Sequence, residues 1–159
     1  MDRIHTIGLI ADTHGLLRPD VFTALDGVEL ILHAGDVGGD GILDELSLIA
    51  PVLAVAGNTD PPDDPRLVPS RVCEVAGTKI HVSHGHELGS PTPAALFARY
   101  TEPIIVYGHT HKQLVSRDGT RWAINPGAAG PRRFNLHPSV ARLRLSGSGV
   151  DVEIVPLRD

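Results

Sequence analysis

Cysteine is nearly absent from this chain, because Cys73 is the only one among 159 residues. A single thiol cannot form a disulfide within the chain, so a reducing compartment suits the protein. Long apolar runs are also missing, since no stretch reaches the roughly 18 residues that a membrane-spanning helix needs. Residues 1–5 lack the apolar core of a signal peptide. We therefore expect a cytoplasmic protein that does not enter a membrane.

Positive charge is in deficit as well. The chain has 14 Lys and Arg residues against 19 Asp and Glu residues, which gives a formal net charge of −5. Such a balance provides no general attraction to nucleic acid or to an anionic membrane, so we expect no stable nucleic-acid partner. Any affinity for phosphate must come from a local site.

Hydrophobic runs in the first half of the chain alternate with amphipathic segments. Apolar runs predict strands over residues 4–11, 29–33 and 51–56, and the segments between them predict helices over residues 18–25 and 42–49. The long spacing between these strands favours parallel pairing through helical crossovers. The Pro- and Asp-rich segment 61–69 is predicted as a loop.

The second half is dominated by predicted hairpins. One hairpin joins residues 71–75 to 79–83, and a second joins 113–117 to 120–124 with its turn at Asp118-Gly119. A helix over 91–99 and a strand over 103–107 lie between them, and antiparallel strands over 140–145 and 150–155 follow. No repeat or linker interrupts the pattern. We expect a single α/β domain over residues 1–159, with either a mixed sheet or two packed sheets.

Five predicted strands end in turns that carry residue types able to bind a metal. Each of these residues alone has an ordinary interpretation as a helix cap, a turn residue or a surface histidine. The repetition favours a metal site, since turns at the carboxyl ends of strands can converge on one point. The candidate ligands are Asp12, His14, Asp36, Asn58, His84, His109 and His111.

The chemistry of this set indicates which ions it would hold. Carboxylate, amide and imidazole ligands without a thiolate suit Mn²⁺, Fe²⁺, Ni²⁺ or Zn²⁺. Seven ligands are too many for one ion, so two ions sharing a bridging carboxylate are expected. Two adjacent metals can make hydroxide available at neutral pH and hold the oxygens of an in-line displacement at phosphorus. The sequence therefore predicts phosphoester hydrolysis.

The same residues occur in an order that resembles the calcineurin-like metallophosphoesterases. The resemblance rests on Asp12-Thr13-His14, Gly35-Asp36, Gly57-Asn58-Thr59-Asp60, His84-Gly85-His86 and Gly108-His109-Thr110-His111. The short chain with Asn125-Pro126-Gly127 is similar to the small bacterial and archaeal phosphodiesterase branch. This resemblance implies an α/β fold, a four-layer α-β-β-α sandwich of two mixed β-sheets flanked by helices, with the site at one edge.

The resemblance also implies individual roles. One metal would be held by Asp12, His14 and His111, and the other by Asn58, His84 and His109. Asp36 would bridge the two ions, of which manganese is the expected kind, with nickel, iron and zinc as alternatives. A hydroxide bridging the metals would then attack phosphorus. The residues expected to take part directly in catalysis are Asp36, Asn58 and His86.

One position departs from the pattern of larger members. Many of them have a histidine directly after the ligand asparagine, where it can protonate the leaving group, whereas this chain has Thr59. A missing general acid, typically worth about 10²–10⁴-fold in rate, penalises poor leaving groups most. The resemblance implies that the small branch shares this absence and prefers phosphodiesters over monoesters, so we expect a small or nucleotide-like phosphodiester as the substrate. His86 is expected either to contact or protonate the substrate or only to orient the site.

Three further residues have weaker indications. His33, three residues before Asp36, is expected to support the ligands from outside, and Arg132 and Arg133 could offer guanidinium groups to a phosphate. The apolar strands late in the chain could provide a homo-oligomer contact.

Two other functions compete with the phosphodiesterase. The resemblance extends to a eukaryotic retromer subunit that uses this fold as a non-catalytic protein-binding scaffold with an impaired metal site. A complete ligand set argues against that alternative. A nuclease acting on long polymers is the other alternative, and the acidic balance disfavours it.

Overall fold

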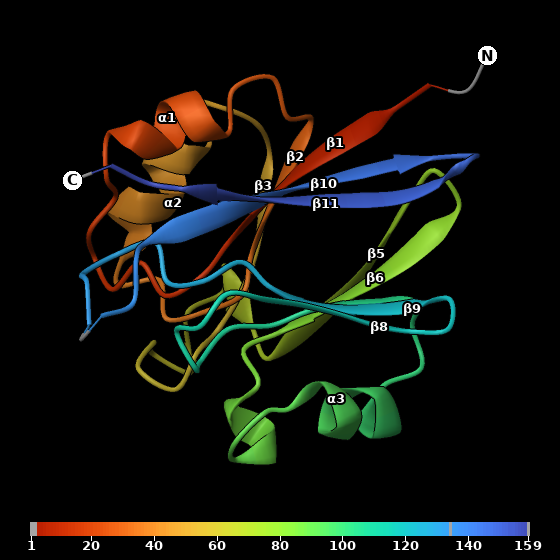
Figure 1. The fold of residues 1–159 in the computed structure, drawn as a ribbon. Coiled ribbons are helices and arrows are strands. Elements are labelled where there is room, and N and C mark those ends of the chain that lie inside the picture. The colour runs from red at the N-terminus through yellow and green to blue at the C-terminus, as the bar shows by residue number, and fades with distance from the viewer. Residues whose placement is uncertain (1–2, 134, 159) are drawn as a thin grey trace.

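The computed structural model describes residues 3–133 and 135–158 and contains two β-sheets that face each other, with helices outside (Figure 1). The first sheet has the order β11 (Gly149–Pro156), β10 (Ser139–Ser146), β1 (His5–Ile10), β2 (Leu30–His33), β3 (Val52–Val55) and β4 (Leu67–Val68). The second has the order β5 (Ser70–Val75), β6 (Thr78–Ser83), β7 (Ile104–Val106), β9 (Arg121–Asn125) and β8 (Leu114–Asp118). Both sheets combine parallel and antiparallel pairs, so both are mixed.

The first sheet arises from the predicted alternation of strands and helices. Strands β1 to β4 pair in parallel, and α1 (Asp20–Ala24) and α2 (Asp40–Leu46) connect the first three. Pro19 caps α1, in keeping with the preference of proline for the start of a helix. Strand β10 then returns antiparallel to β1, which places the last hairpin of the chain beside the first strand.

Three groups of buried side chains define four layers. Val21 of α1 and Leu43 of α2 pack on the outer face of the first sheet, where they belong to one cluster with Ile31. A second cluster fills the space between the sheets. In it, Leu9 and Leu32 of the first sheet contact the second sheet's apolar side chains, which are Ile80, Val82, Ile104, Val106 and Ile124.

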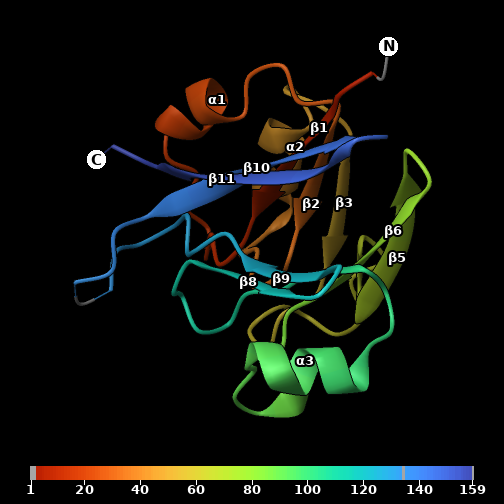
Figure 2. The same cartoon turned by 45° about the vertical axis from the view of Figure 1, so that its right-hand side comes forward.

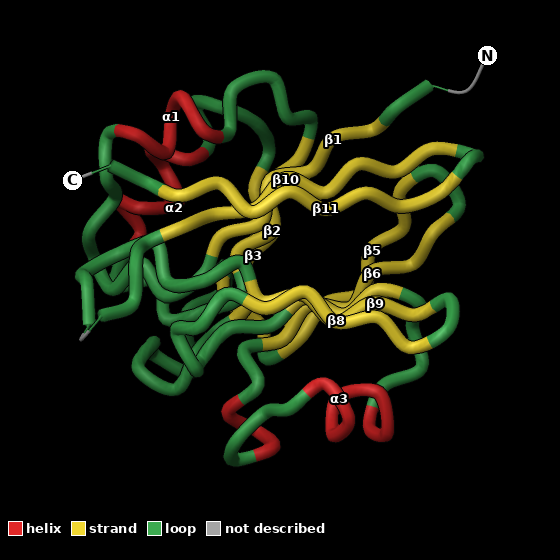
Figure 3. The backbone as a smooth tube through the Cα atoms, viewed as in Figure 1, coloured by secondary structure: helices red, strands yellow, loops and turns green. Residues whose placement is uncertain are grey.

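The fourth layer is α3 (Pro93–Arg99). Its Leu96 packs against Ile105 and Tyr107 of the second sheet. Figures 1 and 2 show in two views that α3 lies on the outer face of this sheet. The central strands thus bury alternate residues against different layers, as Ile31 and Leu32 of β2 and Ile104 and Ile105 of β7 show. The expected four-layer α-β-β-α sandwich is confirmed, and Figure 3 shows the two strand layers between the helices.

Local details differ from the sequence prediction in three places. The segment 61–69 is not a loop throughout, since Leu67–Val68 forms β4 and pairs with the edge of β3. A two-residue strand is too short to show a pattern of alternation. The β8–β9 turn is formed by Gly119 and Thr120, one residue later than predicted, because Asp118 pairs with Arg121. A short 3₁₀ helix, η1 (His86–Leu88), follows β6 and was not predicted.

The hairpin of β5 and β6 agrees with the sequence prediction. Ala76 and Gly77 have φ angles of 52° and 79°, the left-handed values that a tight two-residue turn between β5 and β6 requires. Among the described residues, no helix is long and apolar enough to cross a membrane.

Candidate metal centre

The predicted ligands follow the carboxyl ends of β1, β2, β3, β6 and β7. Parallel pairing of β1, β2 and β3 brings three of these ends to one edge of the first sheet, and parallel pairing of β6 and β7 does the same in the second. The two edges meet, since Nε2 of His84 lies 3.2 Å from Oδ2 of Asp36. The structure therefore brings together turns that are far apart in the sequence.

Five of the predicted ligand side chains fall into two compact groups that share Asp12. Asp12, His14 and His111 each offer one ligand atom within 4.8 Å of the others, and Asp12, Asp36 and His84 do the same. The first group matches the ligand set expected for one metal. The second joins the expected bridge, Asp36, to His84 and adds Asp12. Oδ2 of Asp36 also lies 3.6 Å from Nε2 of His14, so it stands between both groups.

The remaining predicted residues lie around these groups. The ring of His109 is 5.1 Å from that of His84 in an edge-on arrangement, and its backbone N–H donates to Oδ2 of Asp12 at 3.2 Å. His86 is exposed, with its ring 5.3 Å from that of His84. Asn58 is exposed in the loop after β3. These three side chains border the two groups rather than belonging to them.

Four buried side-chain atoms at this site have no hydrogen-bond partner among the described residues: Oδ1 of Asp12, Nε2 of His14, Nε2 of His84 and Nδ1 of His111. Leaving a buried polar atom unsatisfied costs about 1–3 kcal/mol, and native interiors contain few such atoms. All four belong to predicted ligands. Carboxylate oxygens and neutral imidazole nitrogens are the donors that divalent transition metals prefer, so the residues fit a metal site.

Each carboxylate has one oxygen held by the backbone and one left for the site. Oδ2 of Asp12 accepts the N–H of His109, which leaves Oδ1 facing the histidines. Oδ1 of Asp36 accepts the N–H of Thr59 at 3.0 Å, which leaves Oδ2 toward His84 and His14. These bonds fix the orientation of both carboxylates without using the free oxygens.

His84 is held in a defined orientation as well. Its Nδ1 lies 2.9 Å from the carbonyl oxygen of Ala34, and the carbonyl can only accept, so Nδ1 carries the hydrogen. A ring that binds a metal in this orientation directs its Nε2 lone pair toward the space beside Asp12 and Asp36. Burial opposes the charged form of the ring, but the two carboxylates outweigh it and raise the pKa of His84. Histidine ligands of metals are commonly oriented by such a bond from the other ring nitrogen.

Residues 6–148 match the model of the calcineurin-like phosphoesterase superfamily domain. The chain belongs to this superfamily. A probable metallophosphoesterase from Methanothermobacter thermautotrophicus is 34% identical over 159 residues, which cover 94% of this chain and 91% of the relative. A phosphodiesterase from Methanocaldococcus jannaschii is 26% identical over 139 residues, covering 76% of this chain and 82% of the relative.

A solved structure outside the phosphoesterases by name has the same fold. The structure of vacuolar protein sorting 29 from Cryptosporidium parvum superposes with a TM-score of 0.81 at 22% identity, over 98% of this chain and 99% of that one. At this level of identity the likeness concerns the fold.

Burial and neighbouring charges set the protonation of the ligands in this calcineurin-like phosphoesterase. Burial raises the pKa of Asp12 to about 7, although His84 opposes the effect. Burial also disfavours the charged form of Asp36, but contacts with His84 and Thr59 outweigh it and lower the pKa. Burial lowers the pKa of His111 to about 4 and also lowers that of His14, which keeps both imidazoles neutral and able to ligate at pH 7.

The backbone of the centre is unusual. Among the described residues other than glycine, a positive φ occurs at Ala76 and at five of the predicted ligands: Asp12, His14, Asp36, His109 and His111. The left-handed region is unfavourable for such residues and persists where the surroundings impose it, often at functional sites. The strain coincides with the ligand turns, which supports their functional assignment.

Two glycines make room for the carboxylates. A Cβ at Gly57 would overlap Oδ1 and the backbone nitrogen of Asp36, and a Cβ at Gly108 would lie 2.9 Å from Oδ2 of Asp12. Their role is therefore close approach between turns, which their place in the sequence alone does not reveal.

The sequence assigned no role to Asp60, which joins two ligand turns. Its buried carboxylate accepts the backbone N–H groups of Val37 at 3.0 Å, Gly38 at 3.2 Å and Gly57 at 2.9 Å. The bonds link the turn after β2 to the turn after β3. Its position two residues after Asn58 was the only sequence signal.

His33 and Thr13 form another link behind the ligands. The ring Nδ1 of His33 accepts the N–H of Gly35, so Nε2 carries the hydrogen and donates to Oγ1 of Thr13 at 2.9 Å. The Thr13 hydroxyl donates in turn to the carbonyl of Val37. Burial lowers the pKa of His33 to about 3, so the ring stays neutral. As the sequence suggested, His33 supports the ligands without joining them.

Asn125 holds the turn that carries His109 and His111. Its side-chain amide donates to the carbonyl of Gly108 at 3.2 Å and to Oγ1 of Thr110 at 3.0 Å, while its oxygen accepts the N–H of Gly127. This turn, Asn125 to Gly127, was one of the motifs of the family resemblance.

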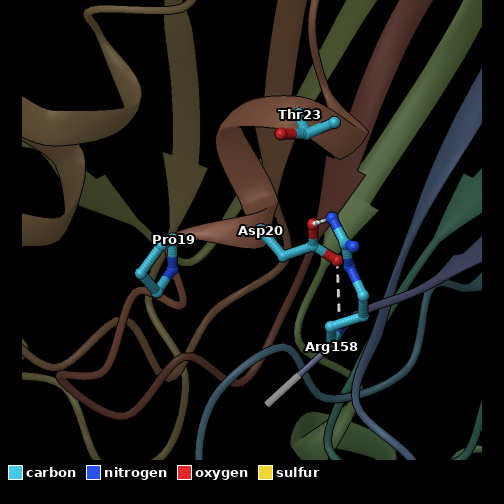
Figure 4. A pocket seen from close by; sticks show the side chains of 4 residues that line it. All are labelled: Pro19, Asp20, Thr23 and Arg158. Carbon is cyan, nitrogen blue, oxygen red and sulfur yellow. Dashed lines mark hydrogen bonds and ion pairs between the residues drawn. The ribbon is translucent and has the colours of Figure 1, made fainter.

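A hollow of about 380 Å³ away from the candidate ligands is lined by Pro19, Asp20, Thr23 and Arg158 (Figure 4). Arg158 pairs with Asp20 through its guanidinium at 3.1 Å and its backbone N–H at 2.9 Å. No predicted ligand lines this hollow, and its cation is already paired. The bonds between Arg158 and Asp20 attach the C-terminal segment to α1.

Proposed function

We propose that this protein is a divalent-metal-dependent phosphodiesterase that holds two metal ions, with manganese as the preferred metal, and acts on a small or nucleotide-like phosphodiester. The observation that carries the proposal is the convergence of four unpartnered buried ligand atoms around two carboxylates. Membership of the superfamily and the names of the archaeal relatives support the reaction class.

The proposed ligand assignment keeps the two expected sets, of which the first has the same members as one compact group and the second shares His84 with the other. Asp12, His14 and His111 would hold one ion, and Asp36 would be shared because its free oxygen stands between His14 and His84. The second ion would be held by the ligands Asn58, His84 and His109. When bound, two such ions supply a hydroxide nucleophile at neutral pH and neutralise charge on the phosphoryl oxygens.

The chain's own residues would prepare the site for this chemistry. The lowered pKa of Asp36 keeps its carboxylate ionised, and the Ala34 carbonyl keeps the His84 ring turned toward it. His86 is exposed beside His84 and His109, where it can contact a bound phosphate or donate a proton to a leaving group. Thr59, also exposed, has no titratable group to fill that role.

Arg133 is the proposed phosphate-binding cation. Its charge is among the causes that lower the pKa of both His14 and His111, which supports a role on that side of the candidate centre. A guanidinium group matches the oxygens of a phosphodiester, and the side chain is exposed.

A non-catalytic scaffold is the second candidate, because the fold is shared with vacuolar protein sorting 29. The two functions make different demands on the site. A scaffold needs a surface, whereas a hydrolase needs every ligand in place.

Hydrolysis of bis(p-nitrophenyl) phosphate and of p-nitrophenyl phosphate, measured after chelation and re-addition of Mn²⁺, tests the proposal. We expect Mn²⁺-stimulated cleavage of the diester that Asp36→Ala and His109→Ala abolish. Asp63→Ala and His137→Ala, which change exposed residues of the same types, serve as matched controls and should retain wild-type activity. Metal-independent cleavage, or full activity of Asp36→Ala, would reject the mechanism. Absence of cleavage in every metal-loaded sample would favour the scaffold.

A further inference from the structure

A hollow of about 300 Å³ lies beside the metal centre and has no role in the assignment above. Asn58 and His86 form part of its lining, and Pro62, Leu67 and Pro69 form much of the remainder. It therefore lies between the loop after β3, strand β4 and the start of η1. Its size is at the lower end of the range for small-molecule sites.

The hollow adjoins the candidate metal centre through the residues that line it. Asn58 is a proposed ligand, and the ring of His86 is 5.3 Å from that of His84. Gly57, which also lines the hollow, is packed so closely against Asp36 that a side chain there would overlap the carboxylate. A phosphodiester bound at the centre would thus have one of its two ester groups beside this hollow.

The lining offers no charge to a ligand. Among the described residues that line it there is no lysine or arginine, and the only carboxylate is that of Asp60. Both oxygens of Asp60 already accept backbone N–H groups, Oδ1 from Val37 and Gly38 and Oδ2 from Gly57. An anionic or cationic group entering the hollow would lose water without gaining a partner of opposite charge that is free to pair with it.

The remaining walls favour an apolar occupant. Pro62, Leu67 and Pro69 present carbon atoms, and Leu67 belongs to the buried core and is only 4% exposed. The exposed imidazole of His86 adds a flat face against which a ring can stack. Apolar surface is removed from water when such a group enters.

We propose that this hollow is the subsite for one ester group of the substrate and that it selects an uncharged apolar or aromatic group. The inference rests on the proposed phosphodiesterase function and narrows its substrate class. Phosphodiesters whose ester groups are both small or both charged would bind without using the subsite.

Calorimetric binding of diphenyl phosphate and dimethyl phosphate to the Mn²⁺-loaded protein tests the subsite. Both probes carry a single negative charge on the phosphate, so a difference in affinity reports on the ester groups. We expect diphenyl phosphate to bind on the order of tenfold more tightly or better. Equal affinities would overturn the proposal.

A pair of proline variants locates the preference. Pro62→Asp places a carboxylate against the hollow and should remove most of the preference for diphenyl phosphate. Pro65→Asp adds the same charge to the same loop at an exposed position outside the lining, and should keep the preference. Loss of the preference in both variants would show a general charge effect and reject the assignment to this hollow. Thermal melting of each variant verifies that it is folded.

Hydrolysis of bis(p-nitrophenyl) phosphate on the same samples separates the two proposals. A preference for diphenyl phosphate that depends on Pro62, without any hydrolysis, would keep the subsite and reject the phosphodiesterase. Hydrolysis without that preference would keep the phosphodiesterase and reject the subsite.

Discussion

Single residues of the metal centre combine deep burial with hydrogen-bonding capacity that the described protein does not satisfy. Oδ1 of Asp12 and Nε2 of His84 are both buried and unpartnered, and they lie 3.8 Å apart. A bound cation would satisfy both. His33 is the opposite case, because both of its ring nitrogens are hydrogen-bonded although it is fully buried. The first kind of residue indicates ligand binding, and the second indicates structural support.

The buried His33 should make stability depend on pH. Burial lowers its pKa from 6.5 to about 3. Between these two pH values, His33 is therefore mostly protonated in the unfolded chain and mostly neutral in the folded protein. Its contribution is fully present above pH 6.5 and is lost as the pH falls toward 3. With a chelator present to remove metal, the unfolding free energy of the wild type should decrease as the pH is lowered from 6.5 toward 3. In His33→Gln this decrease should be smaller by up to about 1.4 kcal/mol per pH unit. Urea unfolding at several pH values measures this, and parallel curves would contradict it.

Thr59 offers a test of the missing proton donor. A histidine at this exposed position would stand next to Asn58, the proposed ligand, where it could protonate a poor leaving group. Thr59→His should raise kcat/KM for p-nitrophenyl phosphate relative to the diester by about tenfold or more, within the range of general acid catalysis. Thr120→His, at an exposed turn in the β8–β9 hairpin, is the control. An unchanged ratio would assign the diester preference to the geometry of the site.

At the scale of elements, the ligand turns are held to one another by hydrogen bonds between loops. Asp60 joins the turns after β2 and β3, and Asn125 joins the turn after β7 to the segment after β9. Strands bring the turns to one edge, but these side chains set the distances between them. Precise placement of the candidate ligands therefore depends on residues outside the candidate set.

Removing the Asp60 carboxylate should separate the two turns. Asp60→Ala would leave the N–H groups of Val37, Gly38 and Gly57 without their acceptor, and each buried unsatisfied group costs about 1–3 kcal/mol. We expect a loss of roughly 2–5 kcal/mol in unfolding free energy, less than the sum because the turns can relax and admit water, together with weaker Mn²⁺ binding. Urea unfolding and metal titration measure both effects. Asp63→Ala is the matched control, and a variant as stable as this control would contradict the proposed link.

At the scale of the whole molecule, the candidate metal centre lies where the two sheets meet. Asp12 and Asp36 follow strands of the first sheet, whereas His84 and His111 follow strands of the second. Each compact ligand group contains members from both sheets. A bound cation would therefore connect the two halves of the sandwich as well as serve catalysis.

Metal binding should consequently stabilise the entire fold. At a free Mn²⁺ concentration about 100 times the Kd, ligand linkage adds about 2.7 kcal/mol per site. For a chain of this length that corresponds to a rise in Tm of roughly 5–11 °C. Calorimetry with Mn²⁺ and with chelator measures the shift, and Asp36→Ala should lose most of it. An identical Tm under both conditions would argue against a folded-state metal site.

Most of the fold could be predicted because short segments of the sequence are enough to identify its strands. Apolar runs that end in glycine-rich turns marked β1, β2, β3, β6 and β7, and the turn at Ala76-Gly77 marked a hairpin. The two-residue β4 and the short η1 carry too few residues to show a pattern. The place of β10 beside β1 depends on pairing between opposite ends of the chain, which local patterns do not encode.

The sequence by itself determined the chemistry of the candidate site. The types of donor residue, and their repeated position just after predicted strands, can be seen in short segments of the chain. Only the tertiary structure decided how those donors meet. It showed that Asp12 is shared by both ligand groups, that Asp60 and His33 support them, and that an uncharged hollow adjoins Asn58 and His86. Distances, unpartnered atoms and cavities arise from contacts between segments remote in the chain, and such contacts exist only after the two sheets have packed together.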